Sequence, residues 1–206
     1  MNFSICKKEG CQNHSVYGSD FCYDHTEDKE ALKTHAVKFI SANKVVKGYN
    51  FSKIPLQGLD FSGKDLSYTI FSECDLTEAD FKRSVLISSF FDFSILNSCD
   101  FSYSQIKFSV FGGASMVKTK IVDTVASFCN FLGADLTESN FNNSDLSHSR
   151  FICCGSAGAS FFNCNLKRTI FQNLIFKMKN LLSSNYQDAV IKDCRCSDGA
   201  IEDILK

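Results

Sequence analysis

The sequence predicts a mainly β protein in which the backbone coils as a four-sided parallel solenoid. From Phe51 to Ile191 every fifth residue is large or apolar, and Ser156 is the single polar exception among these 29 positions. Since 44% of all residues are hydrophobic, about half of 29 unselected positions would be polar. A period of five fits neither a helix nor a plain strand, and it indicates a chain that turns a corner every five residues.

A second ladder, of small residues, lies two positions before the first. From Thr69 to Thr169 all 21 of its positions are Ala, Ser, Thr or Cys, which fits side chains placed beneath a tight corner. Four corners make a coil of twenty residues, and at that spacing Phe recurs from Phe51 to Phe171. We therefore expect about seven to eight coils, with Phe columns facing each other across the axis between slimmer columns of Leu.

The repeated residues resemble those of the pentapeptide-repeat proteins, whose consensus is A(D/N)LXX. The resemblance is clearest in CDLTEADF, from Cys74 to Phe81, and in ADLTESNFNNSDLSHSRF, from Ala134 to Phe151. It implies a right-handed quadrilateral parallel β-helix over residues 49–196. The polar residue before the central position is then expected to serve in turns rather than in catalysis. These residues are Asp60, Asp65, Asp75, Asp80, Asp100, Asp135, Asn140 and Asp145.

The N-terminal end of such a coil needs a cover, because an open coil offers unpaired strand edges. The sequence predicts a capping helix within residues 26–48 that starts at Thr26, Glu27 and Asp28 and is followed by Gly48. Its expected apolar stripe consists of Leu32, Ala36, Phe39 and Ile40.

A second cover is expected at the far end. Residues 197–206 predict a short capping helix, with Ser197 as its N-cap and Ile201, Ile204 and Leu205 on one face. In several members of the family resembled, a terminal segment of this kind also mediates dimerisation. A homodimer through the terminal segments is therefore one expected assembly.

Residues 1–25 differ in composition from the rest and predict a zinc-binding module. Cys6-x4-Cys11, ten further residues and Cys22-x2-His25 have the layout of a closed tetrahedral zinc site. The layout resembles small treble-clef-like or knuckle-like zinc modules. His14 is an alternative fourth ligand, because Cys11-x2-His14 is also a plausible half-site. Four protein ligands leave no open position for substrate, so this zinc is expected to be structural.

The other eight cysteines need no metal. Six fall on the small ladder, Cys196 falls on the large one, and Cys153 is expected to face outward. Their spacing along the coil is too wide for disulfides, whose Cα atoms lie about 5.5 Å apart. Free thiols in this number favour a reducing, cytoplasmic location. The chain also shows no apolar run long enough to span a membrane and no apolar secretion signal.

Outward positions hold the candidate partner-binding residues. They form two neighbouring columns, and apolar residues gathered on consecutive coils exceed the scattered exposure of an ordinary surface. Cover by the N-terminal helix, cover by a second copy, and docking of a different protein are the three explanations. The residues are Tyr68, Ile70, Phe90, Phe108, Val110 and Phe128.

Two functional classes compete on these observations. The first is a non-catalytic protein-interaction scaffold, and the second is a DNA mimic that protects a type II topoisomerase such as DNA gyrase, as the resemblance implies for some family members. Residues 50–206 carry 17 acidic and 15 basic side chains, whereas a duplex of similar length presents about 20 negative charges. Only residues 60–100 are distinctly acidic, with eight acids against three bases, so the scaffold is favoured.

Catalysis and nucleic-acid binding are weaker expectations. Only one of the four histidines, His148, lies within the coils, and a convex rod offers no evident cleft for a catalytic constellation. Nucleic-acid binding through the zinc module would use basic residues that are more simply ordinary solvated side chains. These are Lys7, Lys8, Lys29, Lys33 and Lys38.

Overall fold

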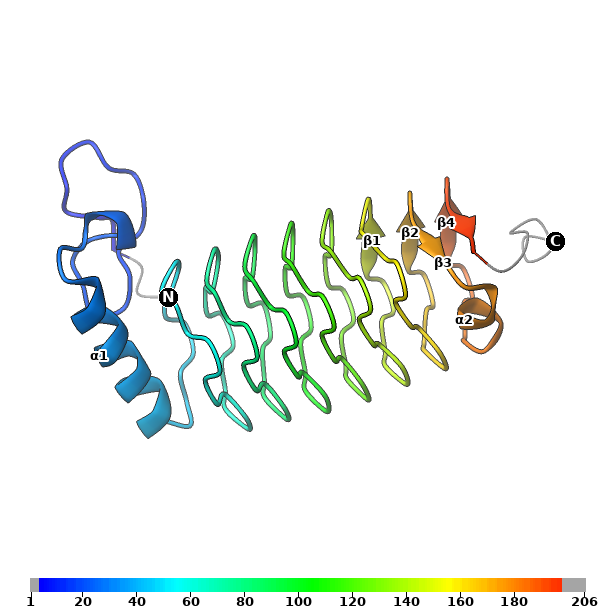
Figure 1. Ribbon diagram of the computed structural model, residues 1–206, viewed down its shortest axis with the longest axis horizontal. Coiled ribbons are helices and arrows are strands. Elements are labelled where there is room, and N and C mark those ends of the chain that lie inside the picture. The colour runs from blue at the N-terminus through cyan, green and yellow to red at the C-terminus, as the bar shows by residue number, and fades with distance from the viewer. Residues whose placement is uncertain (1–3, 198–206) are drawn as a thin grey trace.

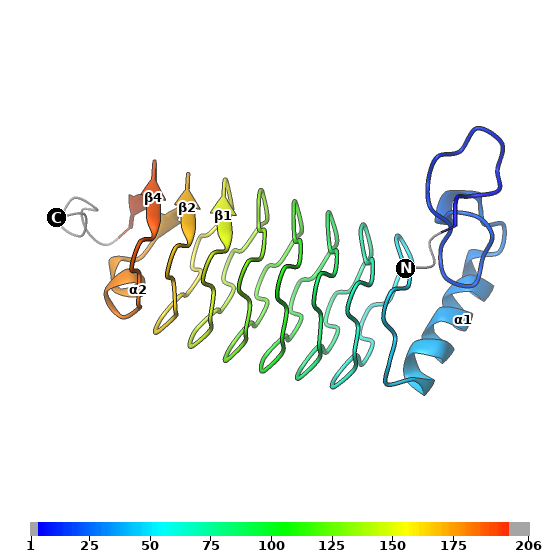
Figure 2. The same ribbon diagram turned by 180° about the vertical axis from the view of Figure 1, so that it is seen from behind.

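A computed structural model describes residues 4–197 and shows a rod of stacked, four-sided coils (Figures 1 and 2). Parallel bridges join residues twenty positions apart all along the rod, from Val45 with Asp65 to Asn165 with Asn185. The backbone hydrogen bonds follow the same step, as in Phe71 N to Phe90 O at 2.7 Å. These are the bridges of a right-handed quadrilateral parallel β-helix, so the predicted fold class is confirmed.

Most sides of the coil pair through a single residue, and extended strands occur only near the C-terminal end. Strands β1 (Arg150–Ile152), β2 (Ile170–Gln172) and β4 (Val190–Lys192) form one parallel sheet. Strands β3 (Ile175–Phe176) and β5 (Arg195–Cys196) form a second. Turns occupy the remaining positions, which keeps each side of the rod short and flat.

Each corner contains a residue with left-handed backbone geometry, two positions after the large inward residue. Most of these residues are not glycine: Tyr68 has φ +62°, Phe108 +59° and Phe128 +61°. A non-glycine residue in this region costs about 1–2 kcal/mol, so the stacked coils on either side must hold the corner in place. A corner residue also directs its side chain outward.

The inward residues fill the axis as the sequence predicts. Phe91 stacks between Phe71 and Phe111 of the adjacent coils, with ring centroids 5.1 and 5.0 Å away. It meets Phe81, of the facing column, edge to face at 5.8 Å. Stacked and edge-to-face pairs are the favoured aromatic geometries, and the interior is closed to solvent.

The small residues of the second ladder also form hydrogen bonds with the backbone. Many of their hydroxyl and thiol groups donate hydrogen bonds to main-chain carbonyls of the preceding coil: Thr119 Oγ1 lies 2.7 Å from Leu96 O, and Cys99 Sγ lies 2.9 Å from Leu76 O. Others, such as Ser84, donate to a carbonyl three residues earlier in their own coil. Ser156, the polar exception on the large ladder, is satisfied in the same way by Ile175 O at 2.7 Å. Polar residues therefore enter this core without unsatisfied donors.

Helix α1 (Lys29–Ala42) lies across the N-terminal end of the rod (Figure 1). Asp28 is its N-cap and accepts a hydrogen bond from Ala31 N at 2.8 Å, so the helix begins after the expected Thr26. Leu32, Ala36 and Ile40 are buried against the first coil. One continuous cluster of buried side chains joins the module, the helix and the coils.

A short helix interrupts the last coils and was not predicted from the sequence. Helix α2 (Met178–Leu182) replaces one corner, yet it keeps Leu181 buried at the position that the five-residue period assigns. Tyr186 and Ile191 belong to the final described coil, and neither is fully buried because no further described coil covers them. The C-terminal capping helix expected at 197–206 lies outside the described residues apart from Ser197.

None of the helices within residues 4–197 has the length and apolar character that a membrane crossing requires.

Candidate metal centre and interaction surface

The first half of the candidate metal centre is a tight turn held by short antiparallel pairing. Ile5 bridges His14, and Cys6 N donates to Asn13 O at 2.8 Å. Between these partners the chain reverses, with Cys11 N donating to Lys8 O at 3.1 Å. Gly10 makes the reversal possible, because its φ of +78° is left-handed, a backbone conformation that glycine adopts without the steric cost of a side chain. The turn brings Cys6 and Cys11 to one side.

The second half is a single helical turn. The 3₁₀-helix η1 (Tyr23–His25) follows Cys22, and His25 N donates to Cys22 O at 3.1 Å. This turn places the Cys22 thiol and the His25 ring together, with Sγ and Nδ1 3.3 Å apart. A Cys-x2-His spacing on one helical turn therefore presents two ligand atoms in one direction.

The two halves meet in a group with the dimensions of a tetrahedral zinc site. One ligand atom from each of Cys6, Cys11, Cys22 and His25 lies within 4.8 Å of every other. The Cys6 Sγ to His25 Nδ1 distance is 3.4 Å, and the Cys11 Sγ to Cys22 Sγ distance is 4.0 Å. Ligand atoms on a tetrahedral zinc are about 3.5–3.8 Å apart, so this group needs little adjustment to hold one ion.

The structure separates the two histidines that the sequence left as alternatives. His25 lies in the four-residue group, whereas His14 lies outside it and lines a neighbouring depression with Tyr23 and Asn50. Three thiols and one imidazole are a soft donor set that suits zinc, and four protein donors close its coordination.

The environment favours the thiolate at one of these cysteines. Burial opposes ionisation of Cys6, but hydrogen bonds from the backbone at Cys22 and Lys8 and from His25 lower the pKa of its thiol to about 6. At Cys11 a hydrogen bond from the Asn13 backbone favours the thiolate, but burial and the Cys6 and Cys22 thiols outweigh it and raise the pKa. A cation at the centre would remove this repulsion between sulfur atoms.

The metal module is joined to the first coil by backbone bonds and stacked rings. Tyr17 N donates to Asn50 O at 2.7 Å, and Asn50 Nδ2 donates to Ser15 O at 2.9 Å. The Tyr17 ring stacks on Phe39 of α1 at 4.4 Å and contacts Phe51 of the first coil at 5.4 Å. The module thus occupies part of the edge that an uncovered coil would expose.

The outward residues predicted to bind a partner lie together on one corner of the rod and the side that follows it. Tyr68, Phe90, Phe108 and Phe128 are exposed, while Ile70 and Val110 are half-buried between them. We call this surface the aromatic strip. It comprises the four residues that follow each of Val46, Leu66, Leu86, Ile106, Ala126, Leu146 and Leu166.

The aromatic strip contains a stacked ladder that extends beyond the predicted residues. Phe108 stacks on Phe128 with centroids 5.0 Å apart, and Phe128 stacks on His148 at 4.5 Å. His148 was not assigned to this surface from the sequence, although its spacing of twenty from Phe128 is a signal that places it there. Leu132 and Phe93, which is 71% exposed, lie beyond the following corner and widen the apolar area.

Helix α1 reaches only the first coil of the aromatic strip, at Tyr49, and leaves its middle coils uncovered. It lies across the end of the rod, where Phe39 packs on Tyr17 and Tyr49, and the middle coils project away from it (Figures 1 and 2). Phe108 and Phe128 remain 53% and 47% exposed. Within the described chain, the explanation that the helix folds back along the rod is therefore wrong.

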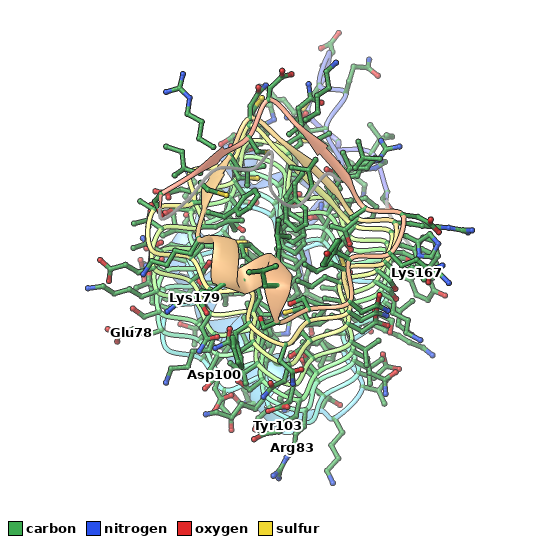
Figure 3. All side chains as sticks on the ribbon, turned by 90° about the vertical axis from the view of Figure 1, so that its right-hand side faces the viewer. Glu78, Arg83, Asp100, Tyr103, Lys167 and Lys179 are labelled. Carbon is green, nitrogen blue, oxygen red and sulfur yellow. The ribbon has the colours of Figure 1, made fainter. Side chains whose placement is uncertain are left out.

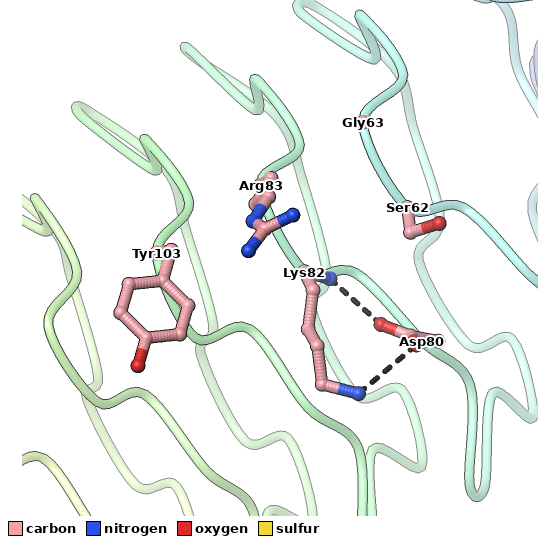
Figure 4. A pocket seen from close by; sticks show the side chains of 6 residues that line it. All are labelled: Ser62, Gly63, Asp80, Lys82, Arg83 and Tyr103. Atoms are coloured by element: carbon pink, nitrogen blue, oxygen red, sulfur yellow. Dashed lines mark hydrogen bonds and ion pairs between the residues drawn. The ribbon is translucent and has the colours of Figure 1, made fainter.

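An open depression on another corner has no catalytic character. It is lined by Ser62, Gly63, Asp80, Lys82, Arg83 and Tyr103 (Figure 4). Lys82 is neutralised there by Asp80 at 3.1 Å and Asp100 at 3.4 Å. The Arg83 guanidinium lies 6.0 Å from the Tyr103 ring. The Lys82 charge is thus paired with carboxylates, whereas Arg83 lies over an aromatic ring.

The fold and the site define the class of this protein: a quadrilateral β-helix with an N-terminal Cys3His module. A family model described as pentapeptide repeats (8 copies) matches residues 50–86, 65–102 and 114–151. The chain belongs to the pentapeptide-repeat proteins.

A solved structure of QnrB1 has the same fold, and a lower similarity is found to a second protein, HetL. A trypsin-treated variant of QnrB1, a plasmid-mediated fluoroquinolone resistance protein, is 15% identical with a TM-score of 0.58, covering 74% of this chain and 82% of that one. HetL, from the cyanobacterium Nostoc and involved in regulating heterocyst differentiation, is 16% identical with a TM-score of 0.43, covering 83% of this chain and 95% of that one. Among curated proteins none matches the chain.

Proposed function

We propose that this protein is a non-catalytic interaction scaffold of the cytoplasm whose N-terminal module is held by one structural zinc. The observation that carries the proposal is the aromatic strip, which leaves stacked rings such as Phe108 and Phe128 exposed on a rigid surface. Exposed apolar patches of this kind mark interaction sites, and stacked coils fix the spacing of the side chains. The partner is another protein.

The packed interior and the character of the surface depressions favour a scaffold over an enzyme. The axis is filled by stacked phenylalanines, one open depression is lined by the Lys82–Asp80 ion pair, and three others lie at the two ends of the rod. Catalysis needs a nucleophile, a base and an orienting group that converge. The Cys3His group favours a structural role over a catalytic one, because four protein ligands around zinc leave no coordination position for substrate.

The docking role is tested by photo-crosslinking at two matched positions. A photoreactive phenylalanine analogue replaces Phe108 in the aromatic strip or Phe162 on another corner; these rings are 53% and 49% exposed. We expect a discrete protein adduct from position 108 and none from position 162 in cells that make the protein. The same adducts from both positions would refute a specific docking surface.

The zinc role is tested by mass spectrometry under native conditions. The intact protein should carry one zinc, and Cys22→Ser should lose it while Cys153→Ser, far from the module, retains it. Incorporation of zinc by both variants, or by neither the parent nor its variants, would contradict the assignment.

A second candidate function is protection of a type II topoisomerase by DNA mimicry. The similarity in fold to QnrB1, a fluoroquinolone resistance protein, is the observation that favours it. The balanced charge of residues 50–206, with 17 acids and 15 bases, argues against it. A gyrase supercoiling assay with a fluoroquinolone tests it directly: protection by the purified protein would place this function above the scaffold.

A further inference from the structure

The aromatic strip is free of carboxylates. Between residues 46 and 170 the chain has twelve Asp and Glu residues, and all of them lie outside the strip. Five of the eleven Lys and Arg residues in the same range lie within it. They are Lys47, Lys107, Arg150, Lys167 and Arg168.

The opposite corner and the side that follows it have the reverse charge. The four residues after each of Leu56, Leu76, Leu96, Met116, Leu136 and Ser156 include five acids and two bases. Lys167, from the strip, and Glu78, from this opposite surface, point away from each other on either side of the rod (Figure 3). No large apolar side chain among these residues is exposed. The two charge types are thus segregated around the axis.

Most of the basic groups of the strip are available to a partner, although Lys47 lies 3.9 Å from the Asp65 carboxylate. Within the part of the chain that the structure describes, no carboxylate forms an ion pair with Lys107, Arg150 or Lys167. Arg168 forms one pair, with Asp188 at 3.6 Å, and both side chains there are more than half exposed. Exposed pairs of this kind are weak, so Arg168 can exchange Asp188 for another carboxylate.

The geometry of the rings selects the kind of molecule that can bind. Phe128 is held between Phe108 at 5.0 Å and His148 at 4.5 Å, in planes tilted by 22° and 13°. Both of its faces are therefore occupied, and its exposed area is ring edge. Nucleic-acid bases bind by stacking on open ring faces, and the central ring of this ladder offers none. Ring edges carry the positive part of the aromatic quadrupole and accept apolar side chains and carboxylates.

We propose, on the basis of the scaffold function above, that the aromatic strip binds an acidic protein segment that also carries apolar side chains. The apolar side chains contact the edges of Phe108 and Phe128, and the carboxylates pair with Lys107, Arg150 and Lys167. The acidic surface of a second copy is a poorer match, because among the described residues this surface exposes no large apolar side chain to meet the rings.

The test measures binding of designed peptides to the full-length protein by fluorescence anisotropy. One labelled peptide repeats Glu-Leu-Glu-Phe, a matched peptide replaces every Glu by Lys, and an oligo-dT of similar length is the nucleic-acid probe. We expect the acidic peptide to bind at least about tenfold more tightly than the lysine peptide, and its affinity to fall as salt is raised. Equal binding of the two peptides, or preference for the lysine peptide, would overturn the proposal.

Charge-reversed variants locate the binding surface. Lys107→Glu with Lys167→Glu should weaken the acidic peptide by about tenfold or more, since each close charge pair adds to affinity. Lys118→Glu with Lys120→Glu makes the same change in net charge on the opposite surface and should leave affinity within about twofold. An equal loss in both double variants would show a general charge effect and refute the strip as the site.

Ring variants separate the remaining outcomes. Phe108→Ser with Phe128→Ser should abolish peptide binding, whereas Phe162→Ser should not, and circular dichroism checks that both fold. Tight oligo-dT binding that depends on Phe108 and Phe128 would overturn the proposal in favour of nucleic acid. Self-association that the same variants remove, measured by sedimentation, would overturn it in favour of a second copy. None of these results decides whether the protein is a scaffold, because the crosslinking experiment tests that function independently.

Discussion

The N-terminal module and the coils use cysteine in opposite ways. In the module, Cys6, Cys11 and Cys22 face one another, and the polar surroundings of Cys6 favour its thiolate. In the coils, Cys99 and Cys129 are buried, and burial raises their thiol pKa to about 12. The difference shows that the repeat uses cysteine as a small residue that donates a weak hydrogen bond, whereas the module gathers three cysteines into a group that could hold a metal ion.

The same two regions differ in what stabilises them. Each coil buries its inward side chains against the coils above and below, so its core is complete. The module has few buried side chains of its own, chiefly Cys6, Val16 and Cys22. A segment this small seldom folds on a hydrophobic core alone and commonly needs a metal. The comparison predicts that the module depends on its ion and the coils do not.

Removing the metal should have the largest effect. Binding of structural zinc is worth about 10–16 kcal/mol in zinc-finger peptides at pH 7, so Cys22→Ser or a chelator should unfold the module. Hydrogen exchange followed by mass spectrometry should show protection lost over residues 4–25 and kept in the coils. Loss of protection throughout the rod would show that the two regions fold as one unit.

Thiol reactivity should differ between two adjacent residues. Cys153 is exposed at a corner, whereas Cys154 is buried, its thiol 2.8 Å from Phe131 O, and burial raises its pKa to about 12. Because the thiolate is the reactive form, iodoacetamide at pH 8 should alkylate Cys153 at least about a thousandfold faster. Peptide mass spectrometry measures both rates. Similar rates in the folded protein would contradict a closed core.

Phenylalanines two residues apart should differ in their effect on stability. Phe91→Ala removes a fully buried ring stacked between Phe71 and Phe111, and it should lower the free energy of unfolding by about 3–5 kcal/mol. Phe93→Ala removes a ring that is 71% exposed and should cost about 1 kcal/mol or less. Urea unfolding measures both. Equal losses would mean that the outward ring is also part of a packed interface.

Acid pH should have the smallest effect on stability, and it should act through the carboxylates in the turns. Hydrogen bonds from Ser62 lower the pKa of Asp60. At Asp100 burial opposes ionisation, but hydrogen bonds from Ser102 and the nearby Lys82 ammonium outweigh burial and lower the pKa of the carboxyl. A pKa that is lower in the folded state contributes stability above the unfolded value near 4, and this stability is lost as pH falls through the folded pKa. Asp100→Asn should keep the turn and flatten the fall of the thermal midpoint below about pH 4.

Asp92 provides the control of opposite sign. Burial raises its pKa, so protonation near pH 4 favours the folded state, and Asp92→Asn should steepen the acid-induced fall. The same response from both variants would show that the turn hydrogen bonds do not set the pH dependence.

The repeat made the coils predictable, because its period fixes which side chains point inward. The same period concealed α2: Phe176 and Leu181 are five apart and buried whether the chain between them turns a corner or forms a helix. The ligand set was predictable from spacing, but the choice of His25 over His14 required the bridge between Ile5 and His14, which directs that histidine elsewhere. Hydrogen bonds such as Thr119 to Leu96 could not be predicted, because they join different coils.

Pairing between residues twenty apart, as in Phe90 with Val110, also restricts how the chain can change in length. Removing or adding one full turn would return each remaining phenylalanine to its own column and shift the downstream half of the rod by one layer. An insertion of five, ten or fifteen residues would keep the rings inward but move every later residue onto a different wall. An insertion that is not a multiple of five would place rings in solvent and charges on the axis. The gene for such a protein is therefore expected to gain or lose segments that encode one full turn. Each such change would alter the length of rod that a partner can contact.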